Sequence, residues 1–174
     1  MELTKAMRMR RSTRSYLPQQ ITDQQLAALL DAAYLSPTAM GRYDHLQLRV
    51  VQDPDVLNAL NADFAAAIGN VDAHPTYGAP TVIFVLGSRE DSEALLGANA
   101  ACMVDQMSLA ATDLGLGSVY LFGICNELKD SAQASALLRI PPQFRMVSAL
   151  AVGVPAEPLA EREPQADRVK VIHI

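Results

Sequence analysis

The long segment of residues 91–114 constrains the fold of this chain most. It is rich in Ala, Met, Leu and small residues on almost every side of a helix, and a helix that is apolar all round must be buried on more than one side. In a chain of 174 residues, the size of one domain, we expect this helix to be the hub of the core and also a subunit interface. Four polar residues, Asn99, Asp105, Gln106 and Asp113, make it unsuited to a bilayer.

Helices and strands alternate around this segment. The sequence predicts helices at 22–34, 54–68, 91–114 and 131–138, strands at 46–51, 81–86, 119–122 and 144–154, and a strand-like run at 168–174. Thr22 and Gln25 have the spacing of a capping box. The run at 168–174 follows an irregular tail, so it needs a host sheet in this chain or in a partner subunit.

Composition and charge exclude several classes of protein. Half of the residues are hydrophobic and 19% are charged, which is a globular composition. The net charge of −5 argues against a nucleic-acid partner. The start of the chain lacks the apolar region of a secretory signal, so we expect a soluble cytoplasmic protein without a membrane partner.

Cysteine and histidine offer no catalytic or metal-binding pattern. Cys102 and Cys125 lie in apolar stretches and are too far apart for a redox or zinc motif, so we expect both to be small buried hydrophobic residues. His45, His74 and His173 show no metal-binding spacing. We therefore predict no metal site and no catalytic side chain.

A dense basic run lies near the start of this acidic chain. Four arginines, Arg8, Arg10, Arg11 and Arg14, occur within seven positions, with Ser12 and Thr13 between them. Guanidinium forks together with hydroxyls suit a phosphate or another polyoxygen anion. The alternative is a solvated helix end, where cations are favoured by the helix dipole and need no ligand.

The segment Gly115-Leu116-Gly117-Ser118 lies between the long helix and a strand. This order differs from the dinucleotide-binding fingerprint, in which the glycines follow a strand and open a helix. Gly115 is expected to be a left-handed helix cap. Gly117, at the strand entry, indicates a backbone that something approaches closely, and a flat ligand would satisfy that requirement.

Five short motifs follow one another along the chain: the arginine run 10–16, Ser36-Pro37-Thr38-Ala39, Gly78-Ala79-Pro80, Gly115-Leu116-Gly117-Ser118 and the strand 149–155. In this order they resemble the FMN-dependent nitroreductase family nearly from end to end. The resemblance implies an α+β sandwich with a mostly antiparallel central sheet flanked by helices, in a single domain of residues 1–174. It also implies an intertwined homodimer with two FMN sites at its interface.

The resemblance also implies the residues that bind FMN. Arg10, Arg11, Ser12 and Arg14 would surround the phosphate and the ribityl or flavin oxygens. Pro37, Thr38 and Ala39 would lie beside the ring of the partner subunit, and the backbone of Gly115, Leu116, Gly117 and Ser118 would pack near the ring. Arg162 would reach the phosphate, with Arg168 and Lys170 as competing cations nearby.

The chain departs from the family in the loop that follows Ala39. The family has the pattern N-x-Q-P-W there, whereas this chain has residues 40–46, Met-Gly-Arg-Tyr-Asp-His-Leu. Gly41 or Arg42 would occupy the position of the flavin-binding Asn. Arg42, Tyr43 and His45 either line an altered pocket or belong to a solvated loop.

The expected activity follows from the resemblance. It implies a flavoenzyme that takes hydride from NADH or NADPH onto FMN and passes electrons to a nitroaromatic, a quinone or a similar small-molecule acceptor. The segment between Ile68 and Tyr77, where larger members carry lid helices, is brief and would leave the flavin face open. The alternative is a flavin-binding carrier or sensor with little reductase activity.

Overall fold

The computed structural model describes the whole chain except the side chain of Asp167. Its helices are α1 (Leu3–Met9), α2 (Asp23–Tyr34), α3 (Pro54–Ile68), α4 (Glu93–Asp113), α5 (Gly123–Leu128) and α6 (Ala132–Leu137). Its strands are β1 (Leu46–Val51), β2 (Thr81–Ser88), β3 (Gly117–Leu121) and β4 (Phe144–Gly153), and three short 3-10 helices lie at Ala39–Gly41, Tyr43–His45 and Ala166–Arg168.

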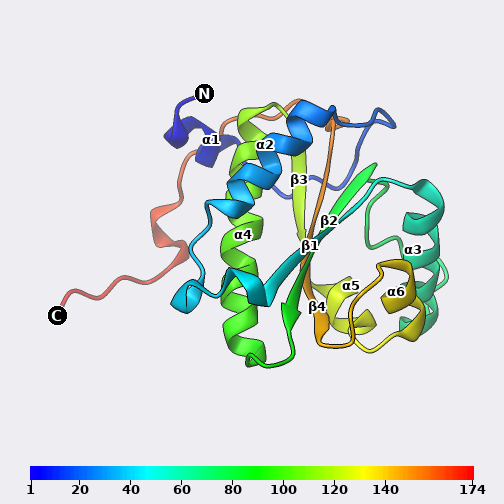
Figure 1. Ribbon diagram of the computed structural model, residues 1–174. Coiled ribbons are helices and arrows are strands. Elements are labelled where there is room, and N and C mark those ends of the chain that lie inside the picture. Colours follow the sequence, from blue (N-terminus) through cyan, green and yellow to red (C-terminus); the bar gives the residue numbers. More distant parts are fainter.

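The strands form one sheet with helices on both faces. Its order is β1-β2-β4-β3, and every neighbouring pair is antiparallel. Helices α2 and α4 cover one face, and α3, α5 and α6 cover the other (Figure 1). The predicted α+β sandwich with an antiparallel central sheet is therefore confirmed.

The capping pattern before α2 forms as the sequence predicts. The Thr22 hydroxyl accepts from the Gln25 backbone N–H at 3.1 Å, and the Gln25 side chain accepts from the Thr22 N–H at 2.8 Å. This reciprocal pair satisfies two of the free N–H groups at the helix start. It fixes where α2 begins, and Leu29 and Ala33 of that helix are fully buried against α4.

Helix α4 is buried on one side only within this chain. Its inner side carries Leu96, Ala100, Val104 and Met107 into the core. Its outer side is exposed at Ala94, Ala98, Ala101, Cys102, Asp105 and Gln106. The expected burial of Cys102 is wrong for the single chain, since its thiol lies on the exposed side, whereas Cys125 is buried in α5.

Residues 168–174 find no host sheet within this chain. The run forms no strand in the described chain, and Val169, Val171 and Ile172 are largely exposed, so of the two expected hosts only a partner subunit remains as a prediction. The alternation of the run favours a strand, but a strand needs a sheet edge to pair with, and no edge of this chain pairs with it.

Two short helices and several strand ends also differ from prediction. The short helices α1 and α5 were not predicted, and β2 continues to Ser88 rather than ending at 86. Strand β3 starts at Gly117 rather than at 119, since the backbone pairs with β4 from the glycine onward. Among the described residues, no helix is both long enough and apolar enough to cross a membrane.

Candidate functional site

The arginine run and the Gly-Leu-Gly-Ser segment lie side by side. The Thr13 N–H donates to the Ser118 carbonyl at 2.9 Å, and Ser12 and Ser118 form a parallel bridge. Further along, Tyr16 forms an antiparallel bridge with Pro155, and the Tyr16 hydroxyl donates to the Thr13 carbonyl at 2.8 Å. The backbone of residues 12–16 is thus fixed along the start of β3 and the end of β4.

Gly115 and Gly117 are each required to be glycine, but for different reasons. Gly115 adopts a left-handed φ of 75°, and the bonds from Leu116 N to Ala111 O and from Gly115 N to Thr112 O close a Schellman cap. A Cβ on Gly117 would lie 2.7 Å from Thr13 Cγ2 and 2.9 Å from Pro155. The close approach that the sequence predicts at Gly117 is therefore made by the chain itself, and no ligand is needed to explain this glycine.

The arginines of the run differ in how far they are paired. Arg8 pairs with Glu163 at 3.1 Å, and Arg11 donates to the Ala160 carbonyl at 2.9 Å. Arg14 lies over the Tyr77 ring, 5.6 Å from its centroid, and otherwise reaches only the Ser12 carbonyl at 3.5 Å. In the described part of the chain, the Arg10 guanidinium has no hydrogen-bond or ion-pair partner.

The tail brings Arg162 to the same region. Its backbone N–H donates to the Arg8 carbonyl at 3.2 Å. The two segments enclose a hollow of about 440 Å³, lined by Thr4, Met7, Arg8, Arg162, Glu163, Pro164, Gln165 and Arg168. Arg162 and Arg168 therefore both lie near the arginine run. The helix-dipole alternative applies to Arg8, in the last turn of α1, but leaves Arg11 and Arg14 unexplained.

An aromatic hollow lies next to Arg14. It has a volume of about 280 Å³ and is lined by Phe64, Ala73, His74, Pro75, Tyr77, Tyr120, Leu121, Phe122, Gly123 and Ile124. Tyr77, under the Arg14 guanidinium, forms part of its wall. Tyr120 and Phe122 are exposed and lie together in the lining of this hollow.

Sequence reasoning missed these aromatic residues. Tyr120 and Phe122 read as ordinary strand residues, and nothing in the sequence ties Tyr77 to Arg14. The structure itself marks Tyr77, which adopts a left-handed φ of 55° just before Gly78. Bulky residues adopt that conformation only under constraint.

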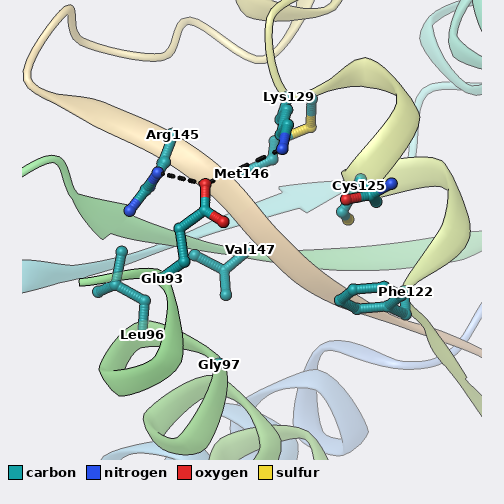
Figure 2. A pocket seen from close by; sticks show the side chains of 10 residues that line it. Glu93, Leu96, Gly97, Phe122, Cys125, Lys129, Arg145, Met146 and Val147 are labelled. Atoms are coloured by element: carbon teal, nitrogen blue, oxygen red, sulfur yellow. Dashed lines mark hydrogen bonds and ion pairs between the residues drawn. The ribbon is translucent and has the colours of Figure 1, made fainter. Parts of the chain in front are cut away.

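A second, smaller hollow lies on the other side of Phe122. Figure 2 shows it between the start of α4, the helix α5 and the first residues of β4. Its volume is about 140 Å³, and Leu96, Cys125 and Met146 contribute to its lining. Burial raises the pKa of the Cys125 thiol above its usual range, so this thiol stays protonated and is a poor nucleophile.

The loop that replaces the family pattern is closed by its own side chains. Arg42 Nη1 lies 2.9 Å from Asp91 Oδ1, and His45 Nδ1 lies 3.0 Å from Asp91 Oδ2. The Tyr43 hydroxyl donates to the Ser36 carbonyl at 3.1 Å. These contacts hold the loop in place, although Arg42 and Tyr43 remain exposed. Gly41 is exposed, with a left-handed φ of 64°.

Three buried hydroxyls in the predicted site segments have no hydrogen-bond partner. They belong to Thr13, Thr38 and Ser118, and a fourth belongs to Ser148 in β4. A buried hydroxyl without a partner costs about 1–3 kcal/mol, so such groups are rare in proteins. The Thr13 and Ser118 oxygens lie where the arginine run meets β3 and offer hydrogen-bonding capacity to a bound polar molecule. The donor set fits a phosphate-bearing cofactor.

The chain thus combines an α+β sandwich with an aromatic hollow next to Arg14 of the arginine run. Residues 7–154 match the Nitroreductase family, and the chain belongs to this family. Membership supports an oxidoreductase activity. No curated protein matches the sequence.

Solved structures share the fold along the whole chain. A nitroreductase with bound FMN from Bacteroides fragilis is 24% identical, with a TM-score of 0.85 over 99% of this chain and 100% of its own. One from Desulfitobacterium hafniense, also with bound FMN, is 19% identical, with a TM-score of 0.85 over 99% and 100%. A candidate nitroreductase in complex with FMN from Desulfovibrio desulfuricans is 27% identical, with a TM-score of 0.76 over 100% and 98%.

Proposed function

We propose that this protein is an FMN-dependent oxidoreductase that transfers electrons from NADH or NADPH to a nitroaromatic, a quinone or a similar acceptor. The observation that carries the proposal is the position of the arginine run: Thr13 fixes its backbone to Ser118 of β3, and the Arg14 guanidinium lies over Tyr77 at the wall of the aromatic hollow. The arginines suit the anionic end of FMN. The hollow suits its flat ring.

The candidate site residues divide into those that would hold the phosphate and those that would hold the ring. Arg10, Arg11, Ser12 and Arg162 form the cationic end, with Arg168 beside them. Tyr77, Tyr120 and Phe122 line the hollow at the other end of β3. Bound FMN supplies the hydride and electron chemistry, while the protein binds, orients and sets the electrostatics around it.

Arg14 has a further role in this proposal. Its guanidinium lies over Tyr77 at the wall of the hollow, so its charge is directed at whatever the hollow contains. A fixed cation placed where negative charge develops stabilises that charge. Arg14 would thus favour the reduced, anionic form of the flavin. No side chain needs to act as a general acid.

The donor and the acceptor would bind in turn on one open face of the ring. Between α3 and β2 the chain forms only turns, with no lid helix over the aromatic hollow. The exposed aromatic side chains of Tyr120 and Phe122 offer a stacking surface. An open face of this kind suits bulky or varied acceptors.

We further infer that residues 1–174 form one domain and that two copies form a homodimer with shared flavin sites, in the cytoplasm. The uncovered outer side of α4 and the exposed apolar tail, with Val169, Val171, Ile172 and Ile174 at the surface, support a second copy. Pro37, Thr38 and Ala39 would then reach the ring of the partner subunit.

The visible absorption spectrum of the purified protein tests the proposal first. FMN released by denaturation at about one per chain, together with oxidation of NADH or NADPH by a quinone or nitroaromatic acceptor, would support it. FMN without turnover would favour a flavin carrier or sensor instead, an alternative that the absent N-x-Q-P-W pattern keeps open. Failure to take up added FMN would refute both.

A further inference from the structure

We propose that Asp91 is a positioning residue for the loop of residues 37–45, and that it sets how this loop meets the flavin. The inference rests on the proposed function, in which Pro37, Thr38 and Ala39 lie beside a flavin ring. Asp91 lies outside the motifs that carry the family resemblance. It belongs to the turn between β2 and α4 and is the buried end of the interactions that close the loop.

The Asp91 carboxylate is nearly inaccessible and fully paired. Its side chain is 4% exposed, and its two oxygens are shared between Arg42 at 2.9 Å and His45 at 3.0 Å. An ionised carboxylate only accepts hydrogen bonds, so His45 Nδ1 carries the proton. Because a buried charge is tolerated only when it is paired, Asp91 and the two loop residues depend on one another.

Asp91 itself is held in place by the core. Its N–H donates to the Ser88 carbonyl at 3.2 Å at the end of β2, and its carbonyl accepts from Arg145 Nη2 at 3.2 Å. Arg145 Nη1 in turn contacts Glu93 at 2.8 Å, and Lys129 lies 3.9 Å from the same carboxylate (Figure 2). The loop is therefore tied to a fixed point, which is in contact with α4 and β4.

The backbone of the loop needs such a tie. Met40 has a left-handed φ of 57° and Gly41 one of 64°, and a non-glycine residue pays for that conformation unless its surroundings impose it. On the near side of this turn, the Ala39 N–H donates to Asn99 Oδ1 of α4 at 3.0 Å. On the far side, Arg42 and His45 reach Asp91.

These two ties set the position of Thr38. Its hydroxyl oxygen is buried and lacks a partner, and it directly precedes the residue that Asn99 holds. If the Asp91 tie is lost, the left-handed turn can relax, and the backbone at Thr38 and Ala39 shifts with it. In this chain the buried Asp91 carboxylate, with Arg42 and His45 of the loop, thus does the orienting work of the missing N-x-Q-P-W pattern.

A pair of neighbouring carboxylates offers a matched experiment. Asp91→Asn removes the buried charge, while Glu90→Gln makes the same change one residue away, on a side chain that is 80% exposed and lies 3.9 Å from His45 Nε2. For each holoprotein, amide hydrogen exchange of the peptide 39–46 measures the loop, and the same measurement on 81–88 controls for global unfolding. The rate of FMN release after dilution, followed by flavin fluorescence, measures the flavin contact.

We expect Asp91→Asn to speed exchange in the loop and FMN release by about ten-fold or more, since hydrogen bonds to charged groups are the strong ones. Exchange in β2 should not change. Glu90→Gln should match the wild type in both measurements. Arg42→Gln removes the other partner of the ion pair, at a side chain that is 45% exposed, and should give the same result as Asp91→Asn. It takes the place of Asp91→Asn in the test if Asp91→Asn folds poorly. Arg42→Lys should recover part of the loss.

Two results would overturn the inference while leaving the proposed function intact. One is wild-type exchange of the loop in Asp91→Asn and Arg42→Gln, and the other is faster exchange with an unchanged rate of FMN release. A wild-type protein that holds no FMN would instead refute the proposed function and the role of Asp91 toward the flavin together. Hydrogen exchange would still decide whether Asp91 holds the loop.

Discussion

Two arginine-bearing segments of this protein are built in opposite ways. In residues 10–16 the backbone is fixed to β3 and β4, but Arg10 and Arg14 contact no carboxylate in the described chain. In residues 37–45 the backbone takes a strained turn and Arg42 is committed to the buried Asp91. A guanidinium that pairs with a buried carboxylate is required by that carboxylate, whereas one that pairs with no carboxylate is available to a ligand.

The largest test of this contrast removes the unpaired cations. A hydrogen bond to a charged group contributes about 1.5–3 kcal/mol. Arg10→Ala with Arg14→Ala, which removes one cation from the phosphate end and one from the ring end, should therefore weaken FMN binding about a thousand-fold and yield protein without flavin. Unfolding temperature without flavin should change little, since neither side chain pairs with a carboxylate. Flavin content of the purified variant gives the answer.

Arg89→Ala is the matched control, because Arg89 is exposed and lies outside both segments. It should keep full flavin content. Full FMN occupancy in the double variant would sink the contrast, since the unpaired arginines would then have no ligand role.

A second test concerns how the arginine run is held rather than what it binds. A Cβ branch on Gly117 would strike Thr13 at 2.7 Å and Pro155 at 2.9 Å. Gly117→Val should therefore push the run away from β3 and cost about 2 kcal/mol or more, as overpacking does. Urea unfolding measures the loss.

Gly97→Ala serves as its control. A Cβ there meets no atom within 4 Å, and alanine favours a helix interior, so stability should rise by about 0.5–1 kcal/mol. Equal stability of Gly117→Val and the wild type would show that residues 12–13 are not fixed against β3.

The sequence was informative wherever the cause is local. The capping box at Thr22, the left-handed cap at Gly115 and most helices and strands depend on neighbouring residues, and all of them form as predicted. The prediction at Gly117 shows the limit. A close approach was correctly expected, but the approaching atoms belong to Thr13 and Pro155, which only the tertiary fold brings there.

The remaining misses share that origin. No local pattern links Tyr77 to Arg14 or Asp91 to Arg42, since each pair joins segments far apart in the chain. Small residues on every side of α4 predict burial but not which side a single chain leaves open, so Cys102 was assigned wrongly. Tyr120 and Phe122, which line the aromatic hollow, fit an ordinary strand pattern and could not be singled out from the sequence.

A smaller effect on stability is expected at Tyr16, whose hydroxyl bonds to the backbone of the arginine run. Its hydroxyl donates to the Thr13 carbonyl at 2.8 Å, so Tyr16→Phe should cost about 1 kcal/mol of unfolding free energy. Burial raises the pKa of Tyr16 above its usual range, although Arg14 opposes this.

The raised pKa of Tyr16 also predicts how the stability of the protein changes with pH. The hydroxyl stays protonated in the folded protein but ionises in the unfolded one above pH of about 10, so the stability it contributes is full below that pH and is lost as the pH rises beyond it. Urea midpoints at pH of about 8 and 11 should fall more for the wild type than for Tyr16→Phe. If the urea midpoint fell equally in the wild type and in Tyr16→Phe, the Tyr16 hydroxyl would be in contact with water.

The smallest expected effect distinguishes the Ser118 hydroxyl, which would bind the ligand, from the Ser148 hydroxyl, which would not. Ser118 and Ser148 both bury a hydroxyl oxygen without a partner, so either change to Ala should leave the flavin-free protein as stable or stabilise it by up to about 1 kcal/mol. Only Ser118 adjoins the arginine run, through its carbonyl bond to Thr13. Ser118→Ala should therefore also weaken FMN binding by a few-fold, about the net value of one hydrogen bond, while Ser148→Ala should not, as flavin fluorescence titration would measure. If both variants bound FMN as the wild type does, the unpaired hydroxyl at Ser118 would be a packing cost of the strand, and the ligand would be held by the arginines alone.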